Sequence, residues 1–428
     1  MDKWYIIFAS NIYDIGGAQL YCDQKAAFLR KIGWRFFLFS TRHGESIVLK
    51  ALKQFQGTVI PHLKYRPYLF SESVQNRIIN QILSQIGLNR QIGGTERVVL
   101  ESHTPSTALW AELVARRLNC KSFVYLLSES FGRGSASVMR FLDFKHQRRE
   151  IAGIDPKSLG LLFRGYKPLK DNENYSLRAG SLDGNVTDYI NPIVDNLERR
   201  DINIGCISRL DKPYVRAVLD EVVLFANRVR NQTVQLVLVG DSQSDRRKRE
   251  IMKKIKEAEN LSLVMTGSLF PLPRSLFEKL DIFIGSAGCA YICANEGALT
   301  ISIDALQHTP IGFLGVDTKE FLYSKNSLSK KSLSGMLEYV FTRRDLATTL
   351  KRGIEKVSSS TCDEEFDCHL RFIRSSSSSS DFYDVSKMTL EMREKILRVI
   401  LACTGLFYGD RLVKKYIFLR DSAAAILK

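Results

Sequence analysis

Four apolar runs in the middle of the chain decide its fold: INIGCIS at 202–208, TVQLVLVGD at 233–241, LSLVMTG at 261–267 and DIFIGSAG at 281–288. Each run is short, apolar and bounded by turn residues, which is typical of a buried strand, while the segments 214–230 and 244–259 have the spacing and charge of helices. Strands that alternate with helices of this length indicate right-handed βαβ units and a parallel sheet. We therefore expect an α/β fold here.

Small and polar residues follow directly after these strands. They are Arg209, Lys212, Gly240, Asp241, Gly267, Ser286 and Gly288. In open parallel sheets, ligands bind beyond the carboxyl ends of the strands. The sequence thus predicts a ligand site built from these residues.

The N-terminal half repeats the alternation of strand and helix. A strand at 4–10 leads into a loop that holds Gly16 and Gly17, and a helix is expected from 18 to 31. The backbone N–H groups and the dipole of such a helix start attract phosphate, whereas the alternative for the glycine pair is a tight turn with positive φ. Further strands are expected at 35–41, 58–63, 97–105, 122–130, 158–166 and 185–191, and further helices at 72–86, 106–117 and 137–150.

Two titratable residues stand at predicted strand ends in this half. His103 follows the strand at 97–105, and Glu129 lies at the end of the strand at 122–130. Polar residues held by loops at the end of a rigid sheet are candidates for catalysis, although a turn position is the alternative for a histidine that precedes Thr-Pro.

The length and composition indicate a globular protein of two domains. The chain has 428 residues and a formal net charge of +16, and no apolar run has the roughly 18–20 residues that a membrane-spanning helix needs. We interpret the apolar start, WYIIFAS at 4–10, as a strand rather than a signal segment, so a cytoplasmic location is expected. Because no nucleic-acid motif is found, we expect no nucleic-acid partner, and anionic lipid and nucleotide diphosphates remain the partners that fit the charge.

The eight cysteines are dispersed and form no CxxC pair, which favours reduced thiols. Cys362, with the Cys368-His369 pair, has ligand types that suit half of a metal site, and the alternative is an exposed variable segment. Since ligands for the other half are not apparent, no metal site is predicted.

The C-terminal region consists of three segments that differ in composition and in expected secondary structure. Helical patterns at 330–356 complete the second domain, and the serine-rich segment 358–380 is predicted to be flexible. Two basic amphipathic helices are then expected, at 390–407 and 410–428. They either pack against a domain or a second copy, or they contact an anionic membrane surface.

Several short pieces, spread over about 1–315, form a recognisable series. They are the Gly-Gly-Ala loop after the first strand, the Gly33 turn, Asn191-Pro192, Ser-Arg-Leu-Asp at 208–211, LVLVGDS at 236–242, VMTGS at 264–268 and DIFIGS at 281–286. The series resembles the GT-B glycosyltransferases, in particular glycosyltransferase family 4. That resemblance implies two Rossmann-like domains that face each other across a cleft, with a helical C-terminal extension. The implied domains are an acceptor-side domain at 1–192, a donor domain at 193–357, the flexible segment at 358–380 and the helical tail at 381–428.

The resemblance also implies an activity. An enzyme of this kind moves a sugar from a nucleotide-sugar donor to a glycan or lipid-linked acceptor, with retention, in bacterial surface polysaccharide assembly at the inner face of the cell membrane. No cofactor is expected, and no metal either, because the chain lacks the Asp-x-Asp of metal-dependent transferases. The alternatives are a non-catalytic scaffold of the same fold and another GT-B enzyme such as a sugar-nucleotide epimerase.

Site residues follow from the same resemblance. Arg209 and Lys212 would hold the donor diphosphate, with Arg216 as a substitute for the lysine, and Gly16 and Gly17 would close from the opposite domain. Fixed cations there favour a leaving diphosphate, whose charge grows in the transition state. His103 and Glu129 are the catalytic candidates. Members often carry a histidine where this chain has Ser128-Glu129, and His103 comes one strand earlier, so it does not directly inherit that role and Glu129 would stand near the sugar instead.

Members also carry two glutamates seven residues apart, and two alignments remain open for them. One makes Glu296 the contact to the transferred sugar and Asp304 the ribose ligand. The other places a helix at 289–296, a C-cap at Gly297 and a strand at 299–303, so that the loop 285–288 binds the donor. We favour the second, because the intervening ALTISI is rich in β-branched residues and reads as a strand.

Overall fold

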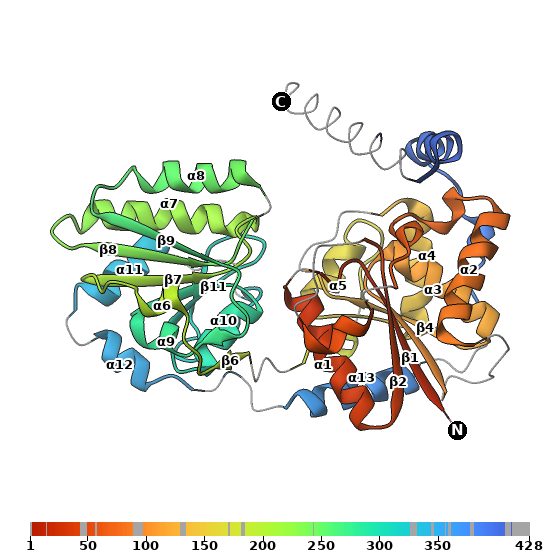
Figure 1. Ribbon diagram of the computed structural model, residues 1–428, viewed down its shortest axis with the longest axis horizontal. Helices are drawn as coiled ribbons and strands as arrows, with labels where there is room; N and C mark the ends of the chain where they lie inside the picture. The colour runs from red at the N-terminus through yellow and green to blue at the C-terminus, as the bar shows by residue number, and fades with distance from the viewer. Residues whose placement is uncertain are drawn as a thin grey trace. The chain divides into compact units, whose positions relative to one another are not determined.

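The computed structural model of the protein describes residues 2–13, 15–42, 49–55, 58–88, 97–128, 134–169, 172–180, 185–242, 244–325, 332–343, 346–355, 357, 361–376, 381–406 and 412. The chain divides into two compact units (Figure 1). Unit 1 consists of Met1–Gly180 and Asp363–Lys428, and unit 2 consists of Ser181–Cys362.

A parallel sheet of five strands forms the centre of unit 1. The strands are β1 (Lys3–Ala9), β2 (Trp34–Ser40), β3 (Val98–Ser102), β4 (Lys121–Leu126) and β5 (Ile151–Gly153). Their order is β2-β1-β3-β4-β5, so the chain runs outward on one side from β1 and on the other side from β3. The carboxyl ends of β1 and β3 therefore flank the topological switch point of this sheet.

Helices cover both faces of the unit 1 sheet. They are α1 (Gly17–Lys31), α2 (Glu72–Ile86), α3 (Pro105–Leu118), α4 (Ala136–Gln147), α5 (Pro156–Phe163) and α13 (Cys362–Arg374), with short 3-10 turns at η1 (Lys50–Phe55), η2 (Pro61–Lys64), η3 (Pro67–Leu69), η4 (Asn172–Tyr175) and η5 (Val385–Lys387). Side chains of α2, α3 and α4 pack with one face of the strands. On the other face, Phe366 of α13 contacts Tyr21 and Phe28 of α1 with ring centroids 5.6 and 5.5 Å apart. A helix that follows unit 2 in the chain thus completes unit 1.

Unit 2 contains a sheet of six strands and a small pair of strands. The strands of the large sheet are β7 (Ile202–Ile207), β8 (Val234–Val239), β9 (Leu261–Gly267), β11 (Ile282–Gly285), β12 (Thr300–Ile303) and β13 (Pro310–Phe313), and the small pair is β6 (Val186–Thr187) with β10 (Leu272–Pro273). The order is β13-β12-β11-β7-β8-β9, and only β13 is antiparallel to its neighbour. The switch point of this sheet lies between β7 and β11.

The helices of unit 2 also lie on both faces of its sheet (Figure 1). They are α6 (Pro192–Asp195), α7 (Pro213–Arg228), α8 (Asp245–Ile255), α9 (Ser275–Lys279), α10 (Gly288–Asn295), α11 (Leu333–Phe341) and α12 (Leu346–Arg352). Apolar residues of α7, α8 and α11 pack with one face, and those of α6, α9 and α10 pack with the other. Both units are therefore Rossmann-like, as the alternating pattern predicts.

Two predicted strands are wrong. The segment 158–166 lies in helix α5 and its following turn, because Asp155 caps the helix and Pro156 takes its first position, where a missing N–H costs nothing. The segment 58–63 contributes one bridge, between Ser40 and Val59, before Pro61 starts the turn η2. In both places a proline after a short apolar stretch opens a helical turn.

The domain boundaries also differ from the predicted ones. Asn191 caps α6 inside unit 2, and β6 pairs with β10, so residues 185–195 pack with unit 2 and the change of unit comes at 180–181. Residues 361–376 are not a flexible segment, because 362–374 form α13, in which Phe366, His369, Leu370 and Ile373 are buried at helical spacing. Residues 377–380 of the serine run lie outside the described residues.

The tail continues as a helix at 392–406. Most of the second predicted tail helix, at 410–428, lies outside the described residues. Within the part of the chain that the structure describes, no helix combines the length and apolar character needed to cross a bilayer.

Candidate functional site

The switch point of unit 2 brings two loops to one edge of the sheet. β11 pairs with β7 so that Ile284 lies beside Cys206, and the residues that follow the two strands leave the sheet at the same level. Arg209 follows β7 and is exposed, and Lys212 occupies the N-cap position of α7 without a side-chain capping hydrogen bond. Asp211 does not hold the guanidinium of Arg209 in this arrangement; its Oδ1 instead accepts a hydrogen bond from Ser242 Oγ at 2.6 Å.

Gly240 and Gly267 shape this edge through the backbone. Gly240 has φ 145°, and a Cβ added there would lie 1.8 Å from the carbonyl oxygen of Ser208. The Gly240 N–H donates to the carbonyl of Gly267 at 2.9 Å, and Gly267 has φ 73°. Gly240 therefore allows the loops after β7 and β8 to approach closely, whereas Gly267 has room for a Cβ and is favoured by its positive φ. Both were predicted as donor-binding residues.

Asp241 is held by a neighbouring cation. Its Oδ1 lies 2.7 Å from Lys248 Nζ, and the Ser242 N–H donates to the same oxygen at 2.7 Å. The hydrogen bond from Lys248 is the main cause that lowers the pKa of Asp241. The predicted ligand role of Asp241 would have to compete with this ion pair.

The loop after β11 has the most distinctive geometry. Ser286 is 5% exposed, and its hydroxyl has no hydrogen-bond partner among the described residues. Ala287 has φ 54°, a left-handed conformation that is strained for a residue with a Cβ, and no side chain caps the helix that starts at Gly288. A buried hydroxyl without a partner, beside the positive end of a helix dipole, is suited to an anionic ligand.

The structure distinguishes the two alignments of the glutamate pair. The segment follows the second one: α10 ends at Asn295, Gly297 has φ 76°, and the strand β12 precedes Asp304. Glu296 thus lies at the C-terminal end of α10, away from the helix start, and its Oε2 accepts from Arg274 at 2.8 Å. The segment thus has the secondary structure that the second alignment predicts.

Asp304 stabilises the loop that follows β12. The residue is completely buried; its Oδ1 accepts from the N–H groups of Leu306 and Gln307 at 2.8 Å, and its Oδ2 accepts from the N–H of Ser324 at 2.8 Å. Backbone donors thus engage both carboxylate oxygens. We assign Asp304 to loop structure rather than to a ligand.

The switch point of unit 1 contains Gly16, Gly17 and His103. Gly16 has φ −173°, which is extended, so the turn with positive φ is not the reason for this glycine. A Cβ at Gly17 would meet nothing within 4 Å. The helix α1 starts there without a side-chain cap, and Gln19 Nε2 donates to the carbonyl of Asn11 at 2.9 Å and closes the loop.

His103 belongs to a buried cluster around Glu101. Its Nε2 lies 2.8 Å from Glu101 Oε1, Tyr21 Oη donates to the same carboxylate at 2.8 Å, and Tyr5 Oη donates to it as well. Lys25, also completely buried, lies with Nζ 3.9 Å from Glu101 Oε2. Burial alone would raise the pKa of Glu101, but Lys25, His103 and the hydrogen bonds outweigh it and lower the pKa to about 2.

Sequence reasoning missed Glu101 and Lys25. The signal for Glu101 was present, because a carboxylate inside the apolar strand VVLES must point into a buried face. Glu129, the other catalytic candidate, lies outside the described residues. His103 is therefore the candidate whose surroundings can be described.

His369 of α13 covers this cluster. Its Nε2 donates to the carbonyl of Arg178 at 2.6 Å, and its Nδ1 lies 3.5 Å from Tyr21 Oη. Burial is the main cause that lowers the pKa of His369 to about 3. Both ring nitrogens face protein partners, so His369 is part of the unit 1 core, and the interpretation as an exposed variable segment is wrong for this residue.

The sequence and the structure of this chain were compared with those of known proteins. No protein-family model matches the chain, and no curated protein matches its sequence. Among solved structures, it is similar to a glycosyltransferase from Rickettsia africae ESF-5, with 12% identity, 87% of this chain and 98% of that chain covered, and a TM-score of 0.55. It is also similar to HepE from Anabaena in complex with UDP-glucose (13% identity, 86% and 98% covered, TM-score 0.56). TarM matches with 8% identity, 88% and 99% covered, and a TM-score of 0.55.

Identities this low establish the fold and not the family. The likeness covers nearly the whole of each related chain. Together with the two Rossmann-like units, it shows that this chain has the GT-B fold, as the sequence predicts.

Proposed function

We propose that this chain is a glycosyltransferase that moves a sugar from a nucleotide-sugar donor to a glycan or lipid-linked acceptor. The observation that carries the proposal is the edge of unit 2, where the exposed Arg209 and the α10 start with the unpartnered Ser286 hydroxyl follow neighbouring strands. A nucleoside diphosphate needs this combination of a cation and open donors. HepE, which has a similar fold, was solved with UDP-glucose.

The chemistry explains why such an edge favours transfer. The bond between the anomeric carbon and the diphosphate oxygen breaks while the acceptor oxygen bonds to that carbon and loses its proton. Negative charge grows on the leaving diphosphate, so Arg209, Lys212 and the α10 start stabilise the transition state more than the bound donor. The Ser286 hydroxyl gains in a phosphate oxygen the partner that it lacks in the described structure.

Unit 1 supplies the acceptor side in this proposal. His103 and the carboxylate of Glu101 form a dyad in which the carboxylate orients the imidazole. Such a hydrogen-bonded arrangement is typical of a histidine that acts as a general base. His103 then takes the proton of the acceptor hydroxyl. Gly16 and Gly17, at an uncapped helix start, are assigned to backbone contacts with a phosphate or sugar oxygen.

The remaining parts of the proposal come from the resemblance to family 4. They are retention at the anomeric carbon, independence of metal ions, a role in bacterial surface polysaccharide assembly and a location at the cytoplasmic face of the membrane. The net charge of +16 fits work on anionic donors and surfaces.

Thermal stabilisation by UDP, GDP and dTDP tests the donor site, because a ligand that binds only the folded state raises its stability. We expect one nucleotide to raise the melting temperature and Arg209→Ala to abolish that rise. Arg249→Ala, an exposed arginine on α8, is the matched control and should leave the rise intact. No stabilisation by any nucleotide, or equal loss in both variants, would contradict the proposal.

Product analysis separates the alternatives. The proposed enzyme forms a glycosylated product only when an acceptor is present. An epimerised sugar nucleotide formed without acceptor would instead identify a sugar-nucleotide epimerase. Nucleotide binding without any turnover would identify a non-catalytic scaffold.

A further inference from the structure

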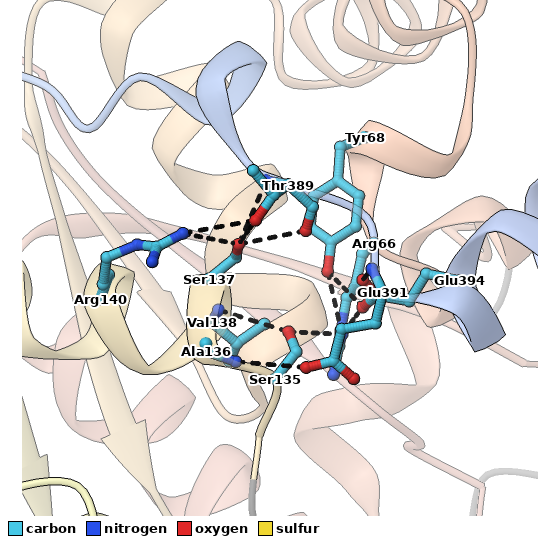
Figure 2. Close-up of polar contacts among 10 residues, drawn as sticks. All are labelled: Arg66, Tyr68, Ser135, Ala136, Ser137, Val138, Arg140, Thr389, Glu391 and Glu394. Carbon is cyan, nitrogen blue, oxygen red and sulfur yellow. Dashed lines mark hydrogen bonds and ion pairs between the residues drawn. The ribbon is translucent and has the colours of Figure 1, made fainter.

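The tail helix 392–406 packs on unit 1 through one face. Leu401 is buried and Leu397 is partly buried in an apolar cluster with residues of α4 and α5. Figure 2 shows Glu394 directed at Arg66 and Tyr68; its Oε1 accepts from Tyr68 Oη at 2.6 Å and forms an ion pair with Arg66. The helix is therefore fixed to the body of unit 1.

The segment before the helix strengthens this attachment. Thr389 N–H donates to Ser137 Oγ at 3.1 Å, and Arg140 donates to the same oxygen at 3.0 Å (Figure 2). The N–H of Ala136 lies 3.4 Å from Glu391 Oε1. Glu391 and Glu394, the two acidic residues of 391–406, thus both contact unit 1.

The opposite face of the helix is apolar and uncovered. Met392, Ile396 and Val399 are 70%, 41% and 62% exposed, and Cys403 is also exposed. Their spacing of four, three and four residues places them in one stripe along the helix. At about 100° per residue, the middle of this stripe lies about 130° from Leu397 and about 170° from Leu401. A helix that is fixed on one apolar face would ordinarily be polar on the other.

Positive charges border the stripe. Arg393 lies on one side and Lys395 and Arg398 lie on the other, and all three are exposed. Glu394 is buried, whereas Glu391 is exposed just before the helix, where it contacts Ala136. The exposed charges within the helix 392–406 are therefore basic. The sequence continues in the same way: residues 392–428 contain eight Lys and Arg and three Asp and Glu, with aromatic and aliphatic residues between them.

We infer that this stripe, Met392, Ile396, Val399 and Cys403 with its border of Arg393, Lys395 and Arg398, is a docking surface for an anionic lipid bilayer. Apolar side chains enter the boundary between headgroups and acyl chains while Lys and Arg contact the headgroup phosphates. A second copy of the chain fits less well, because two stripes in contact would bring two basic borders together without acidic partners.

Vesicle sedimentation of the full chain tests this inference. The probes are vesicles of phosphatidylcholine mixed with phosphatidylglycerol and vesicles of phosphatidylcholine alone. We expect binding to the anionic vesicles that weakens at high salt, because screening removes the attraction to the headgroups. The triple variant Met392→Gln, Ile396→Gln, Val399→Gln should bind about tenfold or more weakly.

The matched control changes three exposed apolar residues of unit 2, with the variant Ile190→Gln, Leu224→Gln, Met252→Gln, and should bind as the unchanged chain does. Circular dichroism confirms that both variants fold. Absence of binding to anionic vesicles, or equal binding of the stripe variant, would overturn the inference. So would a dimer in sedimentation velocity that dissociates in the stripe variant. Binding is measured without donor, so it succeeds or fails independently of the proposed sugar transfer.

Discussion

Each unit has a topological switch point beside the first strand of its main sheet, but the polar groups at the two switch points differ in burial and in their hydrogen-bond partners. In unit 1, the strand ends enclose the carboxylate of Glu101, which takes hydrogen bonds from buried neighbours and is covered by α1 and α13. In unit 2, the strand ends carry the exposed Arg209 and the unpartnered hydroxyl of Ser286. The difference shows how one fold holds a charge in two ways. A charge can be satisfied internally as part of the core, or donors can be left for a ligand to satisfy.

Removal of the buried charge in unit 1 should have the largest effect. Glu101→Gln leaves Lys25 buried without its carboxylate, so we expect a loss of about 3–5 kcal/mol in the free energy of unfolding. Urea titration followed by tryptophan fluorescence measures it, because Trp4, Trp34 and Trp110, the three tryptophans of the chain, all lie in unit 1.

The control for Glu101 is Asp363→Asn. It removes the exposed ion pair of Asp363 with Lys31, where N and O lie 2.5 Å apart, and should leave the free energy of unfolding nearly unchanged because solvent screens the pair. Equal losses for Glu101→Gln and Asp363→Asn would mean that the buried cluster does not stabilise unit 1.

Gly240, which follows β8 in unit 2, and Gly17, at the switch point of unit 1, should respond differently to alanine. Gly240→Ala forces a Cβ toward the Ser208 carbonyl, so we expect a cost of about 2–4 kcal/mol, seen as a lower melting temperature in circular dichroism. Gly17→Ala has room and begins a helix, so its stability should stay the same or rise by about 0.5 kcal/mol. A Gly240→Ala protein that melts like the unchanged chain would show that the loop adapts easily.

Acid should weaken unit 1 in two stages. The pKa of His369 is about 3 in the fold, against an ordinary value of 6.5, so from about pH 6.5 downward the unfolded chain binds a proton that the fold excludes. Below pH 6.5, His369 alone then lowers the free energy of unfolding by about 1.4 kcal/mol for each pH unit, down to about pH 3. The pKa of Glu101, lowered to about 2, adds a contribution that is present above about pH 4.5 and is lost as the pH falls toward 2.

The variant His369→Gln isolates the first stage. The pKa of His369 is about 3 in the fold and 6.5 in the unfolded chain, so its effect falls between these values. Between pH 5 and pH 6.5, the slope of the unfolding free energy against pH should decrease by about 1.4 kcal/mol per pH unit, which corresponds to one proton. Tryptophan fluorescence again reports on unit 1. An unchanged slope would mean that His369 does not exclude the proton.

Ser286→Ala should affect binding without harming the fold. The substitution removes a buried hydroxyl that lacks a partner, so stability should stay the same or rise by up to about 1 kcal/mol, while nucleotide affinity falls about fivefold. Ser302→Ala is the matched control, since its hydroxyl is also buried and without a partner among the described residues. Calorimetric affinities that change equally in both variants would remove Ser286 from the site.

Metal removal should have the smallest effect. We expect EDTA to leave sugar transfer unchanged in a radiolabelled-donor assay, because fixed cations of the chain are proposed to hold the diphosphate. A loss of activity that is restored by Mg²⁺ or Mn²⁺ would contradict this.

Periodicity alone predicted most of the framework. The buried runs of unit 2 and the helix at 72–86 are found where the pattern placed them, because their apolar residues recur with one period over a whole element. The pattern failed where a proline began a helical turn inside an apolar stretch, as at Pro156. It also failed at α13, where the neighbouring serines hid four buried positions at helical spacing.

The candidate site was predicted less completely, for a different reason. Strand ends are visible in the sequence, so Arg209, Ser286 and His103 could be placed. Partners that come from distant segments, such as Lys25 for Glu101 or Arg274 for Glu296, follow only from packing. Asp304 shows the limit clearly, because a carboxylate at a strand end looks the same in sequence whether it binds a ligand or caps its own loop.

The return of α13 to unit 1 has a consequence for biosynthesis. The face of the unit 1 sheet that holds Glu101 receives its cover of Phe366, His369 and Phe372 only after unit 2 has been synthesised. During synthesis, the part of unit 1 at residues 1–180 therefore keeps this apolar and charged surface exposed while all of unit 2 is already available to fold. A stop codon ahead of residue 362 would spare unit 2 and leave the earlier half unfinished.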